Sequence, residues 1–421
     1  LELPLSEEEL RRCGGEKKER SSCGDERGDS SVAPRAYGGG GGTSCVRHRF
    51  FFFFFFFSSL IFLLSVMSDG TSRELKRLLG LSDTDVKDIS KGKIRIIPGS
   101  SNPRLAQSIA DILKIELTPV HLGKFSNGET RCEIGRSCRG LDVYIIQSTC
   151  NSDENDNNVN DNLMELHVMI NALKGASARS INAVMPIYGY ARQDRKDSSR
   201  AAISARLVAK HLEASGVDRV ITVDLHASQI QGFFDVPCDN LYAGPLLVRQ
   251  VVREQQERKE KDPNTPELVV VSPDAGGTKR AVGIARHIGV PAAIISKQRA
   301  EAGVVAEMSL AGDVRGRRAL LVDDMADTCG TLIKAAETLL EHGAVAVDAM
   351  VVHGVLSGPA MERLNECAAL ERLIVTDTIP QTSNMKKTAK LQVFSVAPLL
   401  AEAIRRTHFD ESLHTLFSGQ W

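Results

Sequence analysis

Short apolar runs that alternate with helix-forming segments constrain the fold of this chain more than any other feature. The first apolar runs cover 93–97, 143–147, 181–186 and 220–224, and helical patterns over 103–113, 162–173 and 201–214 separate them. Strands that alternate with helices favour parallel sheets whose two faces are both covered by helices. The sequence therefore predicts an α/β fold.

A second series of the same kind follows the charged segment 253–262, which predicts a surface helix and a connector. Its strands are predicted over 268–272, 292–296, 319–322, 346–352 and 372–375, and a last helix, 397–407, is expected to pack back on one of the two series. Two domains of about 150 residues each fit the usual domain size. We expect domains over 91–242 and 243–398, followed by a C-terminal helix and tail over 399–421.

The first 66 residues differ from the rest of the chain in composition. They contain five consecutive glycines and, from Phe50, eight consecutive phenylalanines, and the first methionine of the chain is Met67. The charge-free run from Phe50 to Met67 has the length of a membrane helix or a signal h-region, whereas composition of this kind has no structural period. We predict that residues 1–66 are disordered, translated upstream sequence. An organelle-targeting extension is the alternative.

Charge and cysteine content narrow the partners and the compartment. The 52 basic and 53 acidic residues give no nucleic-acid or membrane-surface signature, so we expect neither as a partner. The nine cysteines show no paired metal spacing, and we predict reduced thiols in a reducing compartment. A cytoplasmic location is the expectation that follows.

Segment 319–331 joins four apolar residues to a polar loop and then to a helix-forming run, 332–340. We expect the strand to end at Val322, so that Asp323 and Asp324 lie in the turn. The unpaired N–H groups and the dipole at a helix N-terminus favour a bound phosphate, and the neighbouring acids would address sugar hydroxyls or a metal carried by the ligand. The loop therefore predicts a phosphorylated sugar. The alternative is that the acids cap the following helix.

Polar residues also end other predicted strands, at the edge where parallel α/β sheets bind ligands. Arg192 and Gln193 suit polyphosphate and nucleobase contacts, although a solvated basic patch is the alternative. Asp224 and His226 alternate in a segment that we expect to be extended, so they would point the same way and share a metal or a phosphate. A capping Asp and a satisfied histidine form the alternative. Asp274 adds a carboxylate beside two glycines that allow close backbone approach.

Lys297 and Arg299 end a further predicted strand and are expected to face the same way. The small residues 300–305 that follow could form a mobile lid. Stabilisation of a transferring phosphoryl group needs such cations where water is excluded. Surface solvation is the alternative for both.

Five motifs follow one another along the chain: Lys124-Phe-Ser-Asn-Gly-Glu129, Tyr190-Ala-Arg-Gln-Asp194, Asp224-Leu-His-Ala-Ser-Gln-Ile-Gln-Gly-Phe-Phe-Asp235, Ser272-Pro-Asp-Ala-Gly-Gly277 and Val322-Asp-Asp-Met-Ala-Asp-Thr-Cys-Gly-Thr331. In this order they resemble the ribose-phosphate diphosphokinases, or phosphoribosyl pyrophosphate synthetases, of the phosphate-activated, magnesium-dependent first class. The resemblance covers 91–418. It implies two phosphoribosyltransferase-like domains, each a mainly parallel sheet flanked by helices.

The resemblance implies that the C1 hydroxyl of ribose 5-phosphate attacks the β-phosphorus of ATP, giving phosphoribosyl pyrophosphate and AMP. It also implies Mg²⁺ as a cofactor, inorganic phosphate as an activator and a homohexamer built from dimers. A non-catalytic regulatory subunit of the same fold remains one alternative. A phosphoribosyltransferase, which shares the sugar-phosphate loop, is the other.

The same resemblance implies roles for individual residues. Lys297 and Arg299 would act in catalysis. The implied ATP contacts are Arg192 and Gln193, with Phe125, Asn127 and Glu129 from a neighbouring subunit. The implied ribose 5-phosphate contacts are Arg299, Asp323, Asp327, Thr328, Cys329, Gly330 and Thr331. The implied magnesium ligands are His226 and Asp274, with Asp224 in support. The implied nucleotide and phosphate regulatory residues are Ser137, Arg139, Ser228 and Gln231.

Two features depart from the family pattern. The polar run from Asn151 to Asn160 is longer than the family norm and bears on oligomer contacts. The segment after Arg299 lacks the extra basic residues that some members carry, which bears on lid dynamics rather than chemistry.

Overall fold

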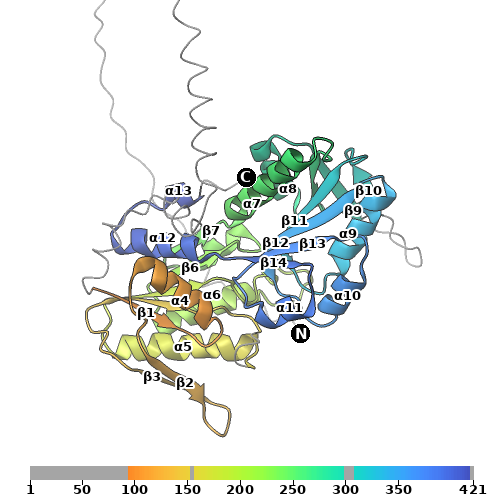
Figure 1. Ribbon diagram of the computed structural model, residues 1–421. Coiled ribbons are helices and arrows are strands. Elements are labelled where there is room, and N and C mark those ends of the chain that lie inside the picture. Colours follow the sequence, from red (N-terminus) through yellow and green to blue (C-terminus); the bar gives the residue numbers. More distant parts are fainter. Residues whose placement is uncertain (1–92, 152–155, 298–307, 418–421) are drawn as a thin grey trace, which may run out of the picture. The chain divides into compact units, whose positions relative to one another are not determined.

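The computed structural model describes residues 93–151, 156–297 and 308–417 (Figure 1). The predictions for residues 1–66, for Arg299 and for the lid over 300–305 therefore lie outside the described residues. So does the central part, 152–155, of the Asn-rich run. The rest of the chain forms two main sheets and a separate hairpin.

The first sheet contains five parallel strands. Their order is β1 (Ile94–Pro98), β4 (Asp142–Ile146), β5 (Ser180–Met185), β6 (Arg219–Val223) and β7 (Cys238–Leu241). One face packs on α5 (Val159–Gly175) and α6 (Ser204–Ser215), and the other packs on α4 (Pro103–Leu113) and α12 (Ala397–His408). Neighbouring residues such as Ile96 and Ile97 enter opposite clusters, as the two-residue period of a strand requires.

The second sheet contains seven strands. Their order is β10 (Met308–Ala311), β9 (Ala292–Lys297), β8 (Leu268–Ser272), β11 (Arg318–Ala326), β12 (Ala346–Gly354), β13 (Arg372–Thr376) and β14 (Leu391–Phe394). All pairs are parallel except β10 with β9. Helices α7 (Gly244–Lys261) and α8 (Thr278–Ile288) share a buried cluster with one face, and α9 (Gly330–Glu341) and α10 (Ala360–Glu366) share one with the other. The predicted α/β fold with mainly parallel sheets is confirmed.

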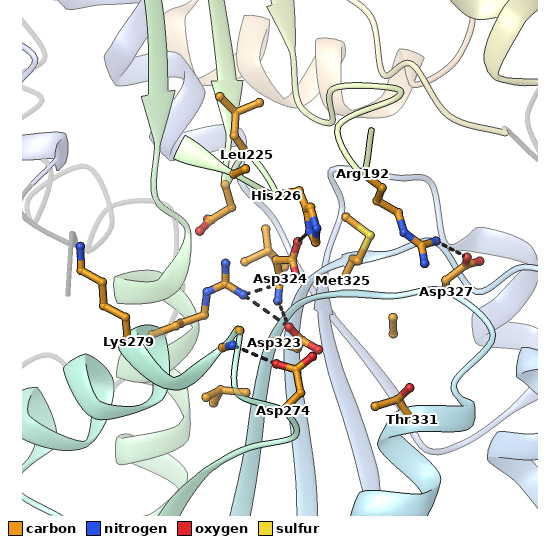
Figure 2. A pocket seen from close by; sticks show the side chains of 18 of the residues that line it. Arg192, Leu225, His226, Asp274, Lys279, Asp323, Asp324, Met325, Asp327 and Thr331 are labelled. Carbon is orange, nitrogen blue, oxygen red and sulfur yellow. Dashed lines mark hydrogen bonds and ion pairs between the residues drawn. The ribbon is translucent and has the colours of Figure 1, made fainter. Parts of the chain in front are cut away.

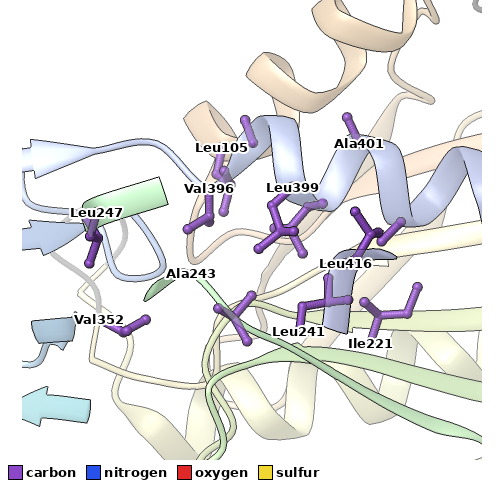
Figure 3. Close-up of a cluster of buried hydrophobic side chains, with 14 of the residues drawn as sticks. Leu105, Ile221, Leu241, Ala243, Leu247, Val352, Val396, Leu399, Ala401 and Leu416 are labelled. Atoms are coloured by element: carbon purple, nitrogen blue, oxygen red, sulfur yellow. The ribbon is translucent and has the colours of Figure 1, made fainter. Parts of the chain in front are cut away.

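The last long helix, α12, returns to the first sheet, as predicted for the segment 397–407. It lies beside α4, and Leu399 packs in one cluster with Ile221 and Leu241 of the sheet and Leu416 of α13 (His414–Phe417), as Figure 3 shows. Helix α12, near the C-terminal end of the described residues, therefore covers a sheet formed by the first strands of the described chain.

Several smaller elements have no counterpart in the predictions. They are the antiparallel hairpin of β2 (Val120–Lys124) and β3 (Thr130–Ile134), the 3₁₀ helix η2 (Ser228–Phe233), and α11 (Thr382–Lys387), together with strands β7, β10 and β14. No helix in the described ranges combines the length and the apolar character that crossing a lipid bilayer requires.

Local capping explains where two of the predicted helices, α4 and α5, begin. Helix α4 has the predicted bounds because Asn102 accepts a hydrogen bond from the Leu105 amide and Pro103 occupies the first turn. Helix α5 begins at Val159, three residues before its predicted start. Asn158 and Asp161 form a reciprocal capping box there, so this end of the Asn-rich run is a helix cap.

Strand β11 is longer than the predicted strand 319–322, and this difference matters for the site. It continues to Ala326 and pairs with β12 at Asp323 and Met325. The expectation that Asp323 and Asp324 lie in a turn is therefore wrong. They are strand residues, and the loop before α9 consists of Asp327 to Cys329.

Candidate active site

One open pocket of about 770 Å³ lies where strands of both sheets end at their carboxyl edges. Residues after β6, β8 and β11 line it, together with Arg192 and Asp194 from the loop after β5 (Figure 2). This is the edge at which parallel α/β sheets bind ligands. The predicted strand-end residues Arg192, Asp224, His226 and Asp274 all line this pocket.

Two adjacent carboxylates of β11 form the electrostatic centre of the pocket. His226 Nδ1 lies 2.6 Å from Asp324 Oδ2, and Arg280 Nη1 lies 3.7 Å from Asp323 Oδ1 and 3.6 Å from Asp324 Oδ1. These contacts join β11 to the segment after β6 and to the first turn of α8, and Figure 2 shows His226 beside Asp324. Asp324 is only 6% exposed, so its charge depends on these partners.

The pocket shifts the pKa values of the two carboxylates in opposite directions. Burial raises the pKa of Asp323, and the negative charge of Asp324 raises it further. Burial alone would also raise the pKa of Asp324, but the hydrogen bond with His226 and the charge of Arg280 outweigh it and hold that pKa below its usual range. The hydrogen bond with Asp324 in turn raises the pKa of His226. The pair therefore keeps a negative charge mainly on Asp324.

Asp224 and His226 do not form the extended pair that the sequence predicts. Asp224 has a φ of 42°, in the left-handed region, which breaks the alternation. Its buried carboxylate accepts a hydrogen bond from the Ala243 amide at 2.7 Å, whereas His226 contacts Asp324. Burial raises the pKa of Asp224. The expectation of an extended segment from Asp224 to His226 is therefore wrong, and Asp224 holds the start of α7.

Asp274 lies in the turn between β8 and α8. Its Oδ1 accepts a hydrogen bond from the Gly277 amide at 2.9 Å, which closes the turn. Among the described residues, no group of three or more His, Cys, Asp or Glu side chains is arranged to hold a metal. Asp224, His226 and Asp274 are thus not a preformed metal cage. Magnesium commonly binds through one or two carboxylates together with substrate phosphates, and the carboxylate-rich lining of this pocket fits that mode.

The loop from Asp327 to Cys329 leads into α9. Cys329 adopts a left-handed conformation with φ 59°, and no side chain forms a cap hydrogen bond at this helix. The alternative in which Asp323 or Asp324 caps the helix is therefore wrong. Burial raises the pKa of the Cys329 thiol to about 11, so this cysteine is protonated at neutral pH and is not an activated nucleophile.

Both carboxylate oxygens of Asp327 are engaged. Arg192 Nη1 lies 2.7 Å from Oδ2, and the Ser357 hydroxyl donates to Oδ1. The Arg363 guanidinium donates to the Thr328 carbonyl at 3.1 Å. The predicted sugar-phosphate loop is thus tied to a residue predicted to contact ATP, and Figure 2 shows this contact on the side of the pocket opposite Lys279.

The structure does not bring every predicted ATP residue to this pocket. Phe125, Asn127 and Glu129 lie at the tip of the β2–β3 hairpin, where Asn127 Oδ1 accepts from the Glu129 amide at 3.2 Å and Phe125 is 53% exposed. Gln193 is exposed and does not line the pocket. Their predicted roles, including that of the hairpin in a neighbouring subunit, stay predictions.

The remaining predicted residues are placed as follows. Ser228 and Gln231 lie in η2, where Gln231 Nε2 donates to the Ser228 carbonyl at 2.9 Å. Ser137 and Arg139 lie between β3 and β4. Lys297 is the last residue of β9, next to the undescribed segment that contains Arg299.

Sequence reasoning missed Arg280, Ser357 and Arg363. Arg280 follows Lys279 in the first turn of α8, where the helix dipole disfavours cations. Two cations in that position are a signal that an anion lies nearby, and the signal was available in the sequence. Ser357 and Arg363 reach the loop from the region after β12, and nothing local to them indicates that contact.

Comparisons with known proteins identify the family and agree with the overall fold. Residues 94–216 match the family described as the N-terminal domain of ribose phosphate pyrophosphokinase, and residues 251–418 match the phosphoribosyl synthetase-associated domain. Ribose-phosphate pyrophosphokinase A of Dictyostelium discoideum is 51% identical over 326 residues, which are 77% of this chain and 98% of that protein. The crystal structure of phosphoribosylpyrophosphate synthetase from Mycobacterium smegmatis is 40% identical with a TM-score of 0.69, covering 76% of this chain and 100% of that one.

Proposed function

This chain belongs to the ribose-phosphate pyrophosphokinase family, and we propose on that premise that it transfers the diphosphoryl group of ATP to ribose 5-phosphate. The observation that carries the proposal is the single pocket in which the predicted sugar-phosphate loop meets the predicted ATP residue, Arg192, at 2.7 Å. A reaction between two bound substrates needs both sites to open on one space. Nothing in the fold or the comparisons favours the non-catalytic alternative.

In the proposed reaction, the C1 hydroxyl oxygen of ribose 5-phosphate forms a bond to the β-phosphorus of ATP. The bond from that phosphorus to the oxygen bridging to the α-phosphorus breaks, and AMP leaves with that oxygen. The hydroxyl proton is released. The products are phosphoribosyl pyrophosphate and AMP, and catalysis rests on positioning and charge rather than on a covalent intermediate.

We assign the sugar phosphate to the loop between β11 and α9. The 5-phosphate would meet the amides of Thr328 to Thr331, because the N-terminus of α9 has no side-chain cap. Asp323 and Asp327 would address the ribose hydroxyls as acceptors. Cys329 is 4% exposed, so it would contribute its backbone rather than its thiol.

We assign ATP to the side of the pocket that carries Arg192 and His226. Magnesium, when bound, would screen the charge of the phosphates. Asp274 and Nε2 of His226 are the protein groups proposed to hold it, and Asp224 is engaged with α7 instead. Arg192 would orient the nucleotide. Lys297 and Arg299 would supply the remaining positive charge, as the family resemblance implies.

We propose that the active form is a homo-oligomer in which a neighbouring hairpin completes the ATP site. The exposed aromatic ring of Phe125 at the hairpin tip supports this, since exposed aromatic side chains are common at interfaces. Activation by inorganic phosphate through Ser137, Arg139, Ser228 and Gln231 is part of the same proposal. Among the described residues, Cys132, Cys138, Cys238, Cys329 and Cys367 form no disulfide, which supports a reducing compartment such as the cytoplasm.

The function is tested with purified full-length protein, ATP, ribose 5-phosphate, Mg²⁺ and inorganic phosphate. Phosphorus NMR should show equal amounts of AMP and phosphoribosyl pyrophosphate. If this protein alone forms no product under these conditions, but product forms when an active homologue is added, the result would support the regulatory alternative. Consumption of an added nucleobase with phosphoribosyl pyrophosphate would instead reveal a phosphoribosyltransferase.

A further inference from the structure

His353 is a buried histidine that joins the two sheets beside the pocket. It lies on β12 of the second sheet and is 2% exposed. Its Nε2 lies 3.1 Å from the carbonyl oxygens of both Val223 and Asp224, at the end of β6 in the first sheet. Its Nδ1 lies 2.9 Å from Thr378 Oγ1. One imidazole ring thus bridges the carboxyl ends of strands from the two sheets.

The hydrogen-bond partners determine the state of the ring. Carbonyl oxygens only accept, so Nε2 carries the proton and donates to the end of β6. Burial lowers the pKa of His353, so the ring is neutral and Nδ1 accepts from the Thr378 hydroxyl. The Thr376 hydroxyl donates to the Val352 carbonyl at 2.7 Å. The Thr378 hydroxyl lies 3.4 Å from the same carbonyl but 2.9 Å from His353 Nδ1, so the shorter contact takes its proton. Both ring nitrogens are therefore satisfied.

The two carbonyls that His353 holds directly precede Leu225 and His226. Other contacts to this segment come from strand β7 of the first sheet: the Asp224 amide donates to the Leu241 carbonyl at 2.8 Å, and the Leu225 amide donates to Asn240 Oδ1 at 2.9 Å. His353 adds a contact from the second sheet. It is the register partner of Met325 on β11, next to Asp324, which is the partner of His226.

We propose that His353 is a positioning residue that fixes the end of β6 against β11 and thereby holds His226 in contact with Asp324. This inference rests on the proposed function, because its benefit is to align the ATP side of the pocket with the sugar-phosphate side. A displacement of about 1 Å between reacting groups can lower a rate about a hundredfold. We therefore expect loss of the His353 contacts to lower kcat by displacing His226.

Two substitutions test the contacts of the two ring nitrogens of His353 separately. The amide nitrogen of His353→Gln reaches the position of Nε2 and keeps a donor for the β6 carbonyls, whereas His353→Asn reaches only the position of Nδ1 and keeps the Thr378 contact. We expect His353→Asn to lower kcat about tenfold or more, with His353→Gln within about threefold of wild type. The Michaelis constant for ribose 5-phosphate should change little in either variant.

A double-mutant cycle with His226→Ala tests the route of the effect. If His353 acts through His226, His353→Asn should lower kcat less than about twofold in the His226→Ala background, because coupled residues are non-additive. His408 is the matched control. It also bonds to a residue of the first sheet, since its Nδ1 lies 2.9 Å from Asp142 Oδ2. Asp142 does not line the pocket, whereas Asp224, which His353 contacts, does. His408→Asn should be additive with His226→Ala.

Thermal unfolding of each variant shows whether it is folded under the assay conditions. Equal losses for the Asn and Gln variants, or the same loss with and without His226, would overturn the positioning role and leave a purely structural one. An inactive wild-type protein would instead contradict the proposed function. The two failures are therefore distinguishable.

Discussion

At the residue scale, the site depends on how three neighbouring carboxylates of the pocket are paired with cationic side chains. Asp323, Asp324 and Asp327 lie within five positions of one another. Arg280 lies near the first two, His226 contacts Asp324 and Arg192 contacts Asp327, and these three partners come from distant parts of the chain. A substrate that brings phosphates and hydroxyls must compete with these contacts. The acids of the pocket are thus held by cationic side chains that are themselves suited to phosphate.

The His226–Asp324 contact predicts a pH dependence. The folded-state pKa of His226 is raised above its usual value of about 6.5. Its contribution to folding stability is therefore fully present below pH of about 6.5 and is lost as the pH rises through the folded-state pKa. An NMR titration of the His226 ring should place its midpoint above the usual value. Asp324→Asn should move it down, and an unchanged midpoint would contradict the pairing.

Arg280 provides a second test at this scale. Replacing it with Met keeps most of the side-chain volume but removes the charge near both carboxylates, so the pair should lose its preference for the ionised form. We expect Arg280→Met to lower kcat/KM about tenfold or more, as removal of one electrostatic contact in an active site often does. Lys279→Met, one residue earlier and more exposed, is the matched control. Equal effects of both substitutions would indicate a general loss of positive charge rather than a specific contact.

At the element scale, local signals predict more than long-range ones. The bounds of α4 were predictable because Asn102 and Pro103 act within one turn. The end of β11 was not, because Asp323 and Asp324 are tolerated in a strand only through partners on α8 and after β6. The turn at Asp224 was missed for the same reason. Its positive φ is stabilised by the Ala243 amide, 19 positions later.

The return of α12 to the first sheet makes a stability prediction. Leu400 is fully buried in the cluster that joins α12 to α4 and the sheet. Leu400→Ala should lower the free energy of unfolding by about 2–5 kcal/mol, because truncation leaves a cavity. Met385, which is 52% exposed on α11, provides the control, and Met385→Ala should cost less than about 1 kcal/mol. Denaturant titrations of both variants give the comparison.

At the scale of the whole molecule, the pocket belongs to neither half of the chain alone. Residues between 192 and 247 supply part of its lining, and residues between 274 and 352 supply the rest. The strand-end positions of both parts were predictable because parallel strands gather their carboxyl ends at one edge. Which side chains meet across the pocket was not, because that depends on how the two sheets pack. The contacts Arg192–Asp327 and His226–Asp324 span 135 and 98 positions.

The Arg192–Asp327 contact makes the last prediction, about how the two substrates communicate. Asp327 Oδ2 lies 2.7 Å from Arg192 Nη1, so a residue of the proposed sugar-phosphate site contacts a residue of the proposed ATP site. Asp327→Ala removes an acceptor for ribose 5-phosphate and should weaken its binding about tenfold or more, since a hydrogen bond to a charged group contributes about 1.5–3 kcal/mol. It also releases Arg192, so ATP should bind as tightly as before or more tightly.

Ser357→Ala, which leaves the Arg192 contact in place, should change the affinity for ATP little. Calorimetric titrations of each ligand measure these affinities, and a selective loss of ATP binding in Asp327→Ala would contradict the division of the pocket.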